Sequence, residues 1–340
     1  MSESRYAAAG VDLESAEAAK RRIAASIEAA RSPLSLGKIG AFGGMVRVPD
    51  GYRRPVLVMS TDGVGTKVMV ARDAGRFDTV GEDLVNHSVN DILVHGARPL
   101  AFLDYVAGAG LAVEQIAGIV EGVARGCRSH GMALAGGETA QMPGLYRAGD
   151  FDLAGTIVGV VEEVEAIHGD AIVPGDVLLA LASTGLHTNG YTLARSILFD
   201  RLGLTIDSPL PETGTTVGDA LLAVHRSYWS ALAPVLGRIH GLAHITGGGI
   251  PGNLIRILPE RCLAVVAQGS WTIPPIFALL AAAGEVSADE MRAVFNLGVG
   301  MVVVLPEAAV PSVQAAGGAA GVQSWRLGEI RAGERGVRFA

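Results

Sequence analysis

One local order of elements occurs in both halves of the sequence, and it limits the folds that the chain can adopt. In the first half, the apolar run PVLVM (residues 55–59) leads into a polar, glycine-containing turn, STDGVGTK (60–67). In the second half, DVLLALA (176–182) leads into STGLHTNG (183–190). Each apolar run is typical of a buried strand, and each turn precedes a helical pattern. The sequence therefore predicts two halves that each combine strands with helices.

The length of 340 residues is more than one ordinary hydrophobic core needs, so two domains are expected. The stretch IHGDAIVPGD, residues 167–176, has the composition of a connection between domains. We predict an α+β protein with α/β-type layers, in which residues 1–167 form an N-terminal domain and residues 168–340 form a C-terminal domain.

Apolar periodicity places the individual elements. Helices are predicted over residues 13–31, 78–96, 113–130, 218–239 and 274–284. Strands are predicted over residues 56–60, 100–108, 132–137, 152–162, 263–267 and 298–306. The strand at 152–162 alternates like a half-buried strand, which indicates a mixed sheet rather than a purely parallel one.

Charge and cysteine content exclude several classes of protein. The net charge of −7 and the absence of a long Lys/Arg block argue against nucleic-acid binding. Cys127 and Cys262 are the only cysteines, so neither a disulfide framework nor a thiolate metal cluster is expected. The apolar stretch 263–284 contains Gln268 and a Pro274-Pro275 pair that would break a membrane helix. We expect a cytoplasmic protein with no membrane partner.

Several carboxylates follow apolar strands or lie within a helical pattern in the first half. Taken singly, each is more often a cap, a turn residue or a surface residue, but together they indicate a Mg²⁺ site beside phosphates. The group consists of Asp62 near Lys67, Asp91 within VNDILV, Asp104, and Glu138 in GGE. Asp91 interrupts an apolar helical pattern, where a charge needs a partner, so a buried salt bridge is the alternative to a bound cation.

Glycines near these acids allow a backbone to approach a phosphate closely. The glycine-rich loop at 37–44 matches neither the phosphate-loop pattern nor the dinucleotide fingerprint, and a flexible flap is one interpretation of it. In the second half, His187 lies on a loop rich in hydrogen-bonding groups, where an imidazole can move protons near neutral pH. An ordinary solvent-exposed histidine is the alternative. TGGG at 246–249 is a weak anion-binding signal.

These stretches, in their order along the chain, resemble the aminoimidazole ribonucleotide synthetases, the phosphoribosylformylglycinamidine cyclo-ligases of purine biosynthesis. The resemblance covers nearly the whole chain, and D-x₄-G-A-x-P at Asp91–Pro99 is similar to the superfamily signature. The matching stretches are YAAAGVD, TDGVGTK, VNDILVHGARP, FLDY, GGETAQMPG, DLAGTIVGVVE, STGLHTNGY, HITGGGIPGN and FNLGVGM.

The resemblance implies a PurM-like fold and an ATP-dependent ring closure. ATP phosphorylates the formyl amide oxygen of formylglycinamidine ribonucleotide, an amidine nitrogen attacks that carbon, and phosphate leaves as 5-aminoimidazole ribonucleotide forms. It also implies a homodimer whose first domains pair strands into a shared barrel.

The resemblance further implies the site residues. His187, Lys67 and Asn189 match catalytic positions, and Asp62, Asp91 and Glu138 match positions near Mg²⁺. The residues implied to contact ATP are Gly40, Gly43, Asp62, Gly63, Gly65, Thr66, Lys67, Asp91, Asp104, Gly137 and Glu138.

This sequence departs from the commoner family pattern at a few positions, none of which removes a proposed catalytic group. The departures are Lys38, His87-Ser88, Arg98 and Gln141. Superfamily relatives that act on thiamin phosphate, selenide, a hydrogenase carbamoyl group or the preceding purine intermediate are alternatives, as is a nucleotide-sensing protein without turnover. A selenide enzyme would carry a reactive Cys or Sec in its glycine-rich loop, which is absent here.

Overall fold

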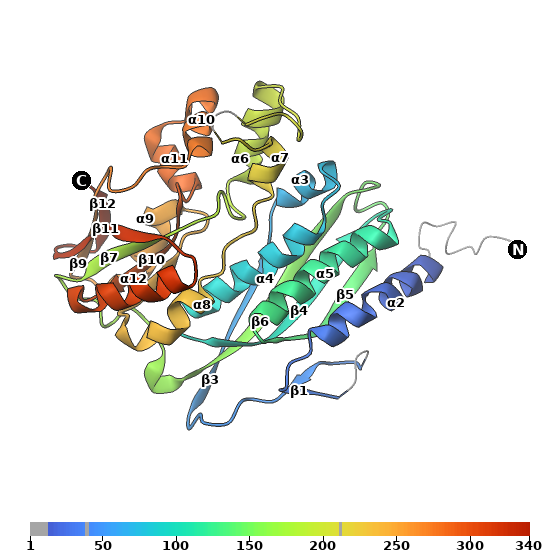
Figure 1. Cartoon of the computed structure of the whole chain (residues 1–340), viewed down its shortest axis with the longest axis horizontal. Helices are drawn as coiled ribbons and strands as arrows, with labels where there is room; N and C mark the ends of the chain where they lie inside the picture. Colours follow the sequence, from blue (N-terminus) through green and yellow to red (C-terminus); the bar gives the residue numbers. More distant parts are fainter. Residues whose placement is uncertain (1–12, 38–40, 211–212) are drawn as a thin grey trace, which may run out of the picture. The chain divides into compact units, whose positions relative to one another are not determined.

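The computed structural model describes residues 13–37, 41–210 and 213–340, and it contains two compact units (Figure 1). The first unit comprises Met1–Val89 and Arg98–Val160, and the second comprises Asn90–Ala97 and Val161–Ala340. The prediction of two units that mix helices and strands is confirmed. Residues 90–97, which the sequence order alone assigned to the first domain, group with the second unit.

A four-stranded mixed sheet in the order β3-β6-β4-β5 forms the base of the first unit. Strand β4 runs parallel to β5 and antiparallel to β6, which confirms the predicted mixed sheet. These strands are β3 (Pro55–Gly63), β4 (Arg98–Gly108), β5 (Ala133–Gln141) and β6 (Phe151–Glu162). A separate short ladder pairs β1 (Ser35–Leu36) with β2 (Met45–Val46).

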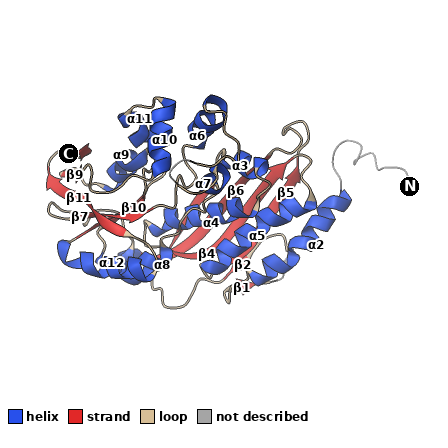
Figure 2. Cartoon of the chain, turned by 45° about the horizontal axis from the view of Figure 1, so that its top comes forward, coloured by secondary structure: helices blue, strands red, loops and turns tan. Residues whose placement is uncertain are grey.

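Helices cover one face of this sheet (Figure 2), and on the other face Leu34, Val46 and Tyr52 pack against one end and leave the rest open. The helices of the unit are α2 (Leu13–Ala29), α3 (Lys67–Asp73), α4 (Asp78–Leu93) and α5 (Val113–Ser129). Thr61 of β3 bonds Thr156 of β6, which pairs with Leu103 of β4, so these positions share the open face. Alternation then places Leu57, Met59, Leu103 and Tyr105 on that face, where they are 50%, 64%, 39% and 38% exposed.

The second unit contains a six-stranded sheet in the order β12-β9-β11-β7-β10-β8. Its strands are β7 (Val177–Ala182), β8 (Gly241–His244), β9 (Cys262–Val266), β10 (Val299–Leu305), β11 (Ser324–Ala332) and β12 (Gly336–Phe339). Its helices are α6 (Tyr191–Arg195), α7 (Val217–Leu221), α8 (Trp229–Leu232), α9 (Gly249–Leu254), α10 (Pro275–Gly284), α11 (Ala288–Val294) and α12 (Val310–Ala319). Short 3₁₀ and π turns join several of these helices.

Strand β7 is buried on both faces, which explains its uninterrupted apolar sequence. Val177, Leu179 and Leu181 point into a cluster that includes residues of α8 and α12. Leu178 and Ala180 point into a second cluster, which includes residues of α9 and β9. The polar loop 183–190 therefore begins where a fully packed central strand ends.

The prediction of one long helix over residues 218–239 is wrong. The region contains α7, an irregular loop at 222–228, α8, and a 3₁₀ turn at Ala233–Arg238. Backbone groups of the loop bond a side chain instead of helical partners: Asn90 accepts from the Tyr228 N–H at 2.9 Å and donates to the Arg226 carbonyl at 2.8 Å. Within the described residues, no helix has the length and apolar character needed to span a membrane.

A buried ion pair joins α3 to α4 in the first unit. Lys67 and Asp83 are both fully buried, and Nζ lies 2.8 Å from Oδ2. Burial lowers the pKa of Lys67, while the Asp83 charge and hydrogen bond oppose that effect. If one residue of the pair were replaced by an apolar residue, the charge of the other would stay buried without the opposite charge that now offsets it.

We therefore predict that Lys67→Met destabilises the chain by about 3–5 kcal/mol, the range for one broken member of a buried pair. The double change Lys67→Met with Asp83→Leu should recover much of this loss, because it removes both charges. Denaturant unfolding followed by circular dichroism measures each variant. Lys20→Met is the matched control: its exposed partner Glu17 lies 2.8 Å away, and little change is expected. A wild-type midpoint for Lys67→Met would contradict the prediction.

Candidate active site

The STDGVGTK motif forms the end of β3 and the start of α3. Gly65 has a positive φ of 55°, which glycine adopts without strain. A Cβ on Gly63 would lie 3.1 Å from the Leu153 carbonyl oxygen of β6, so the strands pack tightly there. The glycines of the motif thus have a local backbone role, and they shape the turn in which Asp62 and Thr66 lie.

Asp62 is positioned by side chains of the same unit. Ser60 Oγ donates to its Oδ2 at 2.7 Å, and His87 Nε2 of α4 lies 3.4 Å from its Oδ1. The Asp62 side chain is 26% exposed, so a ligand can reach it. A carboxylate beside hydroxyl groups provides the hard oxygen donors that suit Mg²⁺, and in this respect the residues fit the ion.

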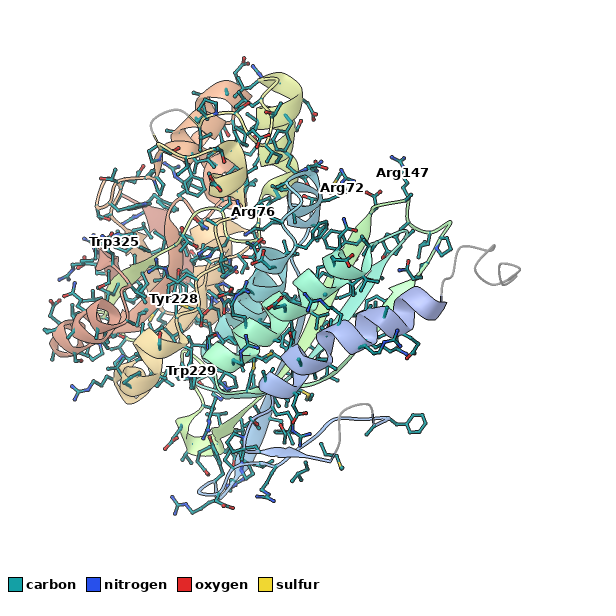
Figure 3. All side chains as sticks on the ribbon, turned by 45° about the vertical axis from the view of Figure 1, so that its right-hand side comes forward. Arg72, Arg76, Arg147, Tyr228, Trp229 and Trp325 are labelled. Atoms are coloured by element: carbon teal, nitrogen blue, oxygen red, sulfur yellow. The ribbon has the colours of Figure 1, made fainter. Side chains whose placement is uncertain are left out.

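A hollow of about 320 Å³ opens beside this turn. Arg72, labelled in Figure 3, lies on its wall and pairs with Asp150. The lining residues are Gly65, Thr66, Val68, Met69, Arg72, Tyr146, Asp150, Phe151 and Asp152. The volume is at the lower end of small-molecule sites, which span roughly 300–1,000 Å³. It is therefore large enough for only part of a nucleotide.

Asp104 and Gly137 form a close pair across β4 and β5, where they are register partners. A Cβ on Gly137 would overlap the Asp104 carboxylate, so the glycine provides space for that group. Burial raises the pKa of Asp104 to about 7. The Asp104 side chain is buried, and its contact with ATP stays a prediction. Glu138, the next residue of β5, is exposed.

The structure does not bring Asp62 and Glu138 together within one chain. Asp62 lies on β3 and Glu138 on β5, the two edge strands, with β6 and β4 between them. Three strand spacings of ~4.8 Å separate their backbones by roughly 14 Å, too far for both carboxylates to bind one ion. Lys67 is buried against Asp83, and a phosphate role for it stays a prediction that requires its amine to leave Asp83.

The glycine-rich loop is described only in part. Gly43 lies between β1 and β2, and a Cβ added to it would meet no described atom within 4 Å. Gly40 and Lys38, and the stretch YAAAGVD at 6–12, lie outside the described residues.

In the second unit, His187 lies on the loop after β7 and is 1% exposed. Its φ of 61° is unusual for a residue with a side chain and occurs often at functional sites. The Thr184 N–H donates to its Nε2 at 3.2 Å. A Cβ on Gly300 of β10 would come within 2.6 Å of His187 Cε1, so this glycine provides the space for the ring. The alternative of a solvent-exposed histidine is wrong.

Two further histidines surround His187, and the sequence reasoning missed both. His225, from the loop 222–228, stacks on the His187 ring with centroids 3.9 Å apart. His244, the last residue of β8, has its Nε2 3.0 Å from His225 Nε2. The stretch HITGGG marked His244 as part of a motif, whereas no sequence signal indicated His225.

Asp91 lies beside these rings in the second unit. Its Oδ1 accepts from His244 Nδ1 at 2.7 Å, and its side chain is 25% exposed. Asp91 therefore has a buried hydrogen-bonding partner, as its position in an apolar helix required. Its role as a metal ligand stays a prediction.

Asn189 connects the His187 loop to the glycine turn at 246–249. Its Oδ1 accepts from the Gly247 N–H at 3.0 Å, and its Nδ2 is buried without a hydrogen-bond partner among the described residues. Asn253 holds the same turn by donating to three of its carbonyl groups. A buried donor without a hydrogen bond is a candidate ligand contact, because such a group destabilises the fold unless something binds it.

Comparison with known proteins identifies relatives of both units. The sequence model of the AIR synthase related protein N-terminal domain matches residues 43–161, and that of the C-terminal domain matches residues 173–340. A phosphoribosylformylglycinamidine cyclo-ligase of Desulfatibacillum aliphaticivorans is 47% identical over 330 residues, covering 96% of this chain and 95% of the relative. One of Myxococcus xanthus is 46% identical over 332 residues, covering 97% and 96%.

Solved structures show the same fold at low sequence identity. A thiamine-monophosphate kinase from Stenotrophomonas maltophilia superimposes with a TM-score of 0.67 at 17% identity, covering 95% of both chains. The hydrogenase maturation protein HypE in complex with ATP superimposes with a TM-score of 0.64 at 18% identity, covering 94% of this chain and 91% of that one.

The raised pKa of Asp104 predicts a pH-dependent stability. The folded chain holds a proton there up to about pH 7, whereas the unfolded chain loses it near pH 3.8, so unfolding stability falls as pH rises between these values. The loss should be roughly 3 kcal/mol between pH 5 and pH 8. Asp104→Asn keeps the shape and should remove this component. Urea unfolding at both pH values measures it, and identical pH profiles for both proteins would contradict the assignment.

Proposed function

The chain belongs to the phosphoribosylformylglycinamidine cyclo-ligases, ATP-dependent ligases within the AIR synthase related proteins, and we propose the reaction and its residues from that membership. The reaction is the ATP-dependent closure of formylglycinamidine ribonucleotide to 5-aminoimidazole ribonucleotide in purine biosynthesis, with release of ADP and phosphate. The main support for this proposal is the sequence identity of 43–47% between this chain and curated cyclo-ligases, across at least 91% of the chain.

Phosphorylation solves a leaving-group problem. The formyl amide oxygen is a poor leaving group, and transfer of the ATP γ-phosphoryl group to it forms an oxygen–phosphorus bond while ADP departs. The amidine nitrogen then forms a bond to the same carbon, and the carbon–oxygen bond breaks as phosphate leaves. Phosphoryl transfer is driven mostly by positioning and charge stabilisation, so oriented donors matter more than a nucleophilic side chain.

In the first unit, the turn at 62–67 is the proposed phosphate contact. The backbone there approaches β6 closely, the carboxylate of Asp62 lies at the start of the turn, and the hydroxyl of Thr66 lies near its end. Mg²⁺, when bound, offsets phosphate charge and orients the transferred group. Asp62, partly exposed and oriented by Ser60, is the residue best placed to hold it.

In the second unit, His187 and Asn189 are the proposed substrate contacts. The Thr184 N–H occupies His187 Nε2, so the neutral ring carries its proton on Nδ1 and can donate from there. Asn189 has a buried amide nitrogen that can donate to a substrate oxygen. Such donors can stabilise negative charge that develops on the amide oxygen or on the departing phosphate.

We further propose that the protein is a cytoplasmic homodimer formed through the first unit. The open sheet face exposes Leu57, Met59, Leu103 and Tyr105, an apolar surface of the kind that a partner covers. Strands β3 and β5 are edges of a four-stranded sheet, and two such sheets can close into an eight-stranded barrel without edges. Pairing of β5 with β3 of a second copy would also bring Glu138 of one copy toward Asp62 of the other.

The reaction is tested with purified protein, ATP, Mg²⁺ and formylglycinamidine ribonucleotide, followed for ADP and aminoimidazole ribonucleotide. His187→Asn should lower turnover by about 10²- to 10⁴-fold, the range for a lost acid–base group, with little change in ATP affinity. Asparagine tolerates the left-handed backbone at this position, so the variant removes the imidazole without straining the loop.

The controls separate chemistry from structure. His187→Gly also fits the positive φ, and its turnover should be lowered to the same degree. If His187→Asn alone kept its activity, the imidazole would serve only as a hydrogen-bonding group that asparagine can replace. Parallel loss of ATP binding and thermal stability would show a structural role. ATP binding by the wild-type protein without ADP release on addition of the substrate would favour a nucleotide sensor over a ligase.

The dimer is tested by a charge on the open face. Met59→Asp, at the most exposed apolar position of β3, should convert a dimer into a monomer at micromolar concentration, measured by sedimentation. Val164→Asp is the matched control, because Val164 is also exposed, at 79%, but lies in the second unit. A wild-type monomer with full activity would contradict the dimer.

A further inference from the structure

Arg195 of the second unit is a half-buried cation that has no partner among the residues that the structure describes. Its Nε is buried without a hydrogen bond, and no ion pair or hydrogen bond joins its guanidinium to a described residue. A guanidinium keeps its charge in proteins, so Arg195 cannot become neutral. A charge that is partly removed from water is costly unless an opposite charge or an acceptor binds it. Arg195 therefore has a free capacity to bind an anion.

Other arginines of the second unit do have partners. Arg226, which is also half-buried, donates to the Gly321 carbonyl at 3.0 Å. Arg201, six residues after Arg195, is exposed and pairs with Glu285. The missing partner is thus a property of Arg195 and not of every arginine in this part of the chain.

The position of Arg195 on α6 directs its side chain toward the loop that holds the proposed substrate contacts. Tyr191 and Arg195 lie four residues apart on one face of the helix, one turn or about 6 Å along its axis. The Tyr191 hydroxyl donates to the Leu221 carbonyl at 2.5 Å, which places this face beside α7. Side chains on a helix lean toward its N-terminus, so the Arg195 guanidinium extends toward residues 183–190.

A second unsatisfied donor lies at the same end of α6. Asn189, two residues before the helix begins, has a buried Nδ2 without a partner in the described part of the chain. A π-helix over Ser196–Arg201 directly follows Arg195, and such rare helices occur frequently at functional sites. One amide donor and one cation, six residues apart, match a ligand that has an oxygen acceptor in one part and an anionic group in another.

The proposed substrate has both of these parts. Formylglycinamidine ribonucleotide contains a formyl amide, which reacts, and a phosphate on its ribose, which does not react in the ring closure. If Asn189 contacts the amide, as proposed above, the ribose separates the phosphate from that contact and the phosphate extends to Arg195. A guanidinium binds phosphate through two parallel N–H···O bonds. Binding energy from a group that does not react can orient the group that does.

We propose that Arg195 binds the ribose phosphate of the substrate. The identity of the ligand rests on the proposed function, whereas binding of a sugar phosphate to Arg195 does not require turnover. ATP also carries phosphate groups, so the test must separate these two sources.

The first test is calorimetric titration of the full-length protein with ribose 5-phosphate and, separately, with ribose. The wild type should bind the phosphorylated sugar more tightly. Arg195→Met keeps an apolar stem and removes the charge, and it should weaken ribose 5-phosphate binding by roughly 10- to 100-fold, the range for lost hydrogen bonds to a charged group. Arg201→Met is the matched control and should bind like the wild type.

The second test is steady-state kinetics with formylglycinamidine ribonucleotide and ATP. Arg195→Met should raise the KM for the ribonucleotide by a similar factor and leave the KM for ATP near the wild-type value. Its unfolding temperature should not fall, because the substitution removes no hydrogen bond to the described chain. A lower unfolding temperature with parallel loss of both ligands would show a structural role and overturn the proposal.

The remaining outcomes also decide the question. Equal ribose 5-phosphate affinity in the wild type and Arg195→Met would overturn the proposal, as would a rise in the KM for ATP alone, which would assign the phosphate to the nucleotide. Weaker ribose 5-phosphate binding by Arg195→Met, in a protein without ring-closing activity, would support the phosphate site and contradict the proposed reaction. If Arg195→Met fails to fold, Arg195→Lys replaces it. Lysine lacks the planar fork, so an affinity about fivefold weaker is expected and an unchanged affinity would overturn the proposal.

Discussion

The second unit depends on one buried amide, the side chain of Asn90. It is fully buried, accepts from the Tyr228 N–H, and donates to the Arg226 carbonyl. These two backbone groups would otherwise have helical partners, so Asn90 holds residues 222–228 out of a helix. The loop then carries His225 to His187 and positions Tyr228, labelled in Figure 3, to donate its hydroxyl to the Ala182 carbonyl at the end of β7.

The same interaction explains what sequence reasoning could and could not predict. Strands β3, β4, β6, β7 and β10 were predicted because apolar periodicity is local. The helix predicted over 218–239 was wrong because its backbone is captured by a residue more than a hundred positions earlier. Local patterns carry no information about such a contact. His225 was missed for the same reason, since only the loop that Asn90 holds brings it to His187.

The sequence also did not predict which individual polar residues are buried, or against which partners. Lys67 matched a position near phosphate, yet the fold encloses its amine with Asp83, a residue that no motif marked. Asp91 was recognised as needing a partner because it interrupts an apolar helix, but His244 could not be identified as that partner. The motif glycines were detected as a group, whereas their individual reasons differ: Gly65 turns the backbone, Gly137 makes room for Asp104, and Gly300 makes room for His187.

The homodimer proposed above would account for two features of the first unit. Its sheet leaves an apolar face and two edge strands open, and it separates Asp62 from Glu138 by the width of the sheet. Covering the face alone would not require any particular pairing of strands. Bringing the two carboxylates together does require a particular pairing, because they lie on opposite edge strands. In the proposed dimer, only pairing of β3 of one copy with β5 of the other would place them side by side. In the proposed homodimer, closure of the barrel and completion of the proposed magnesium site would therefore require the same pairing of strands.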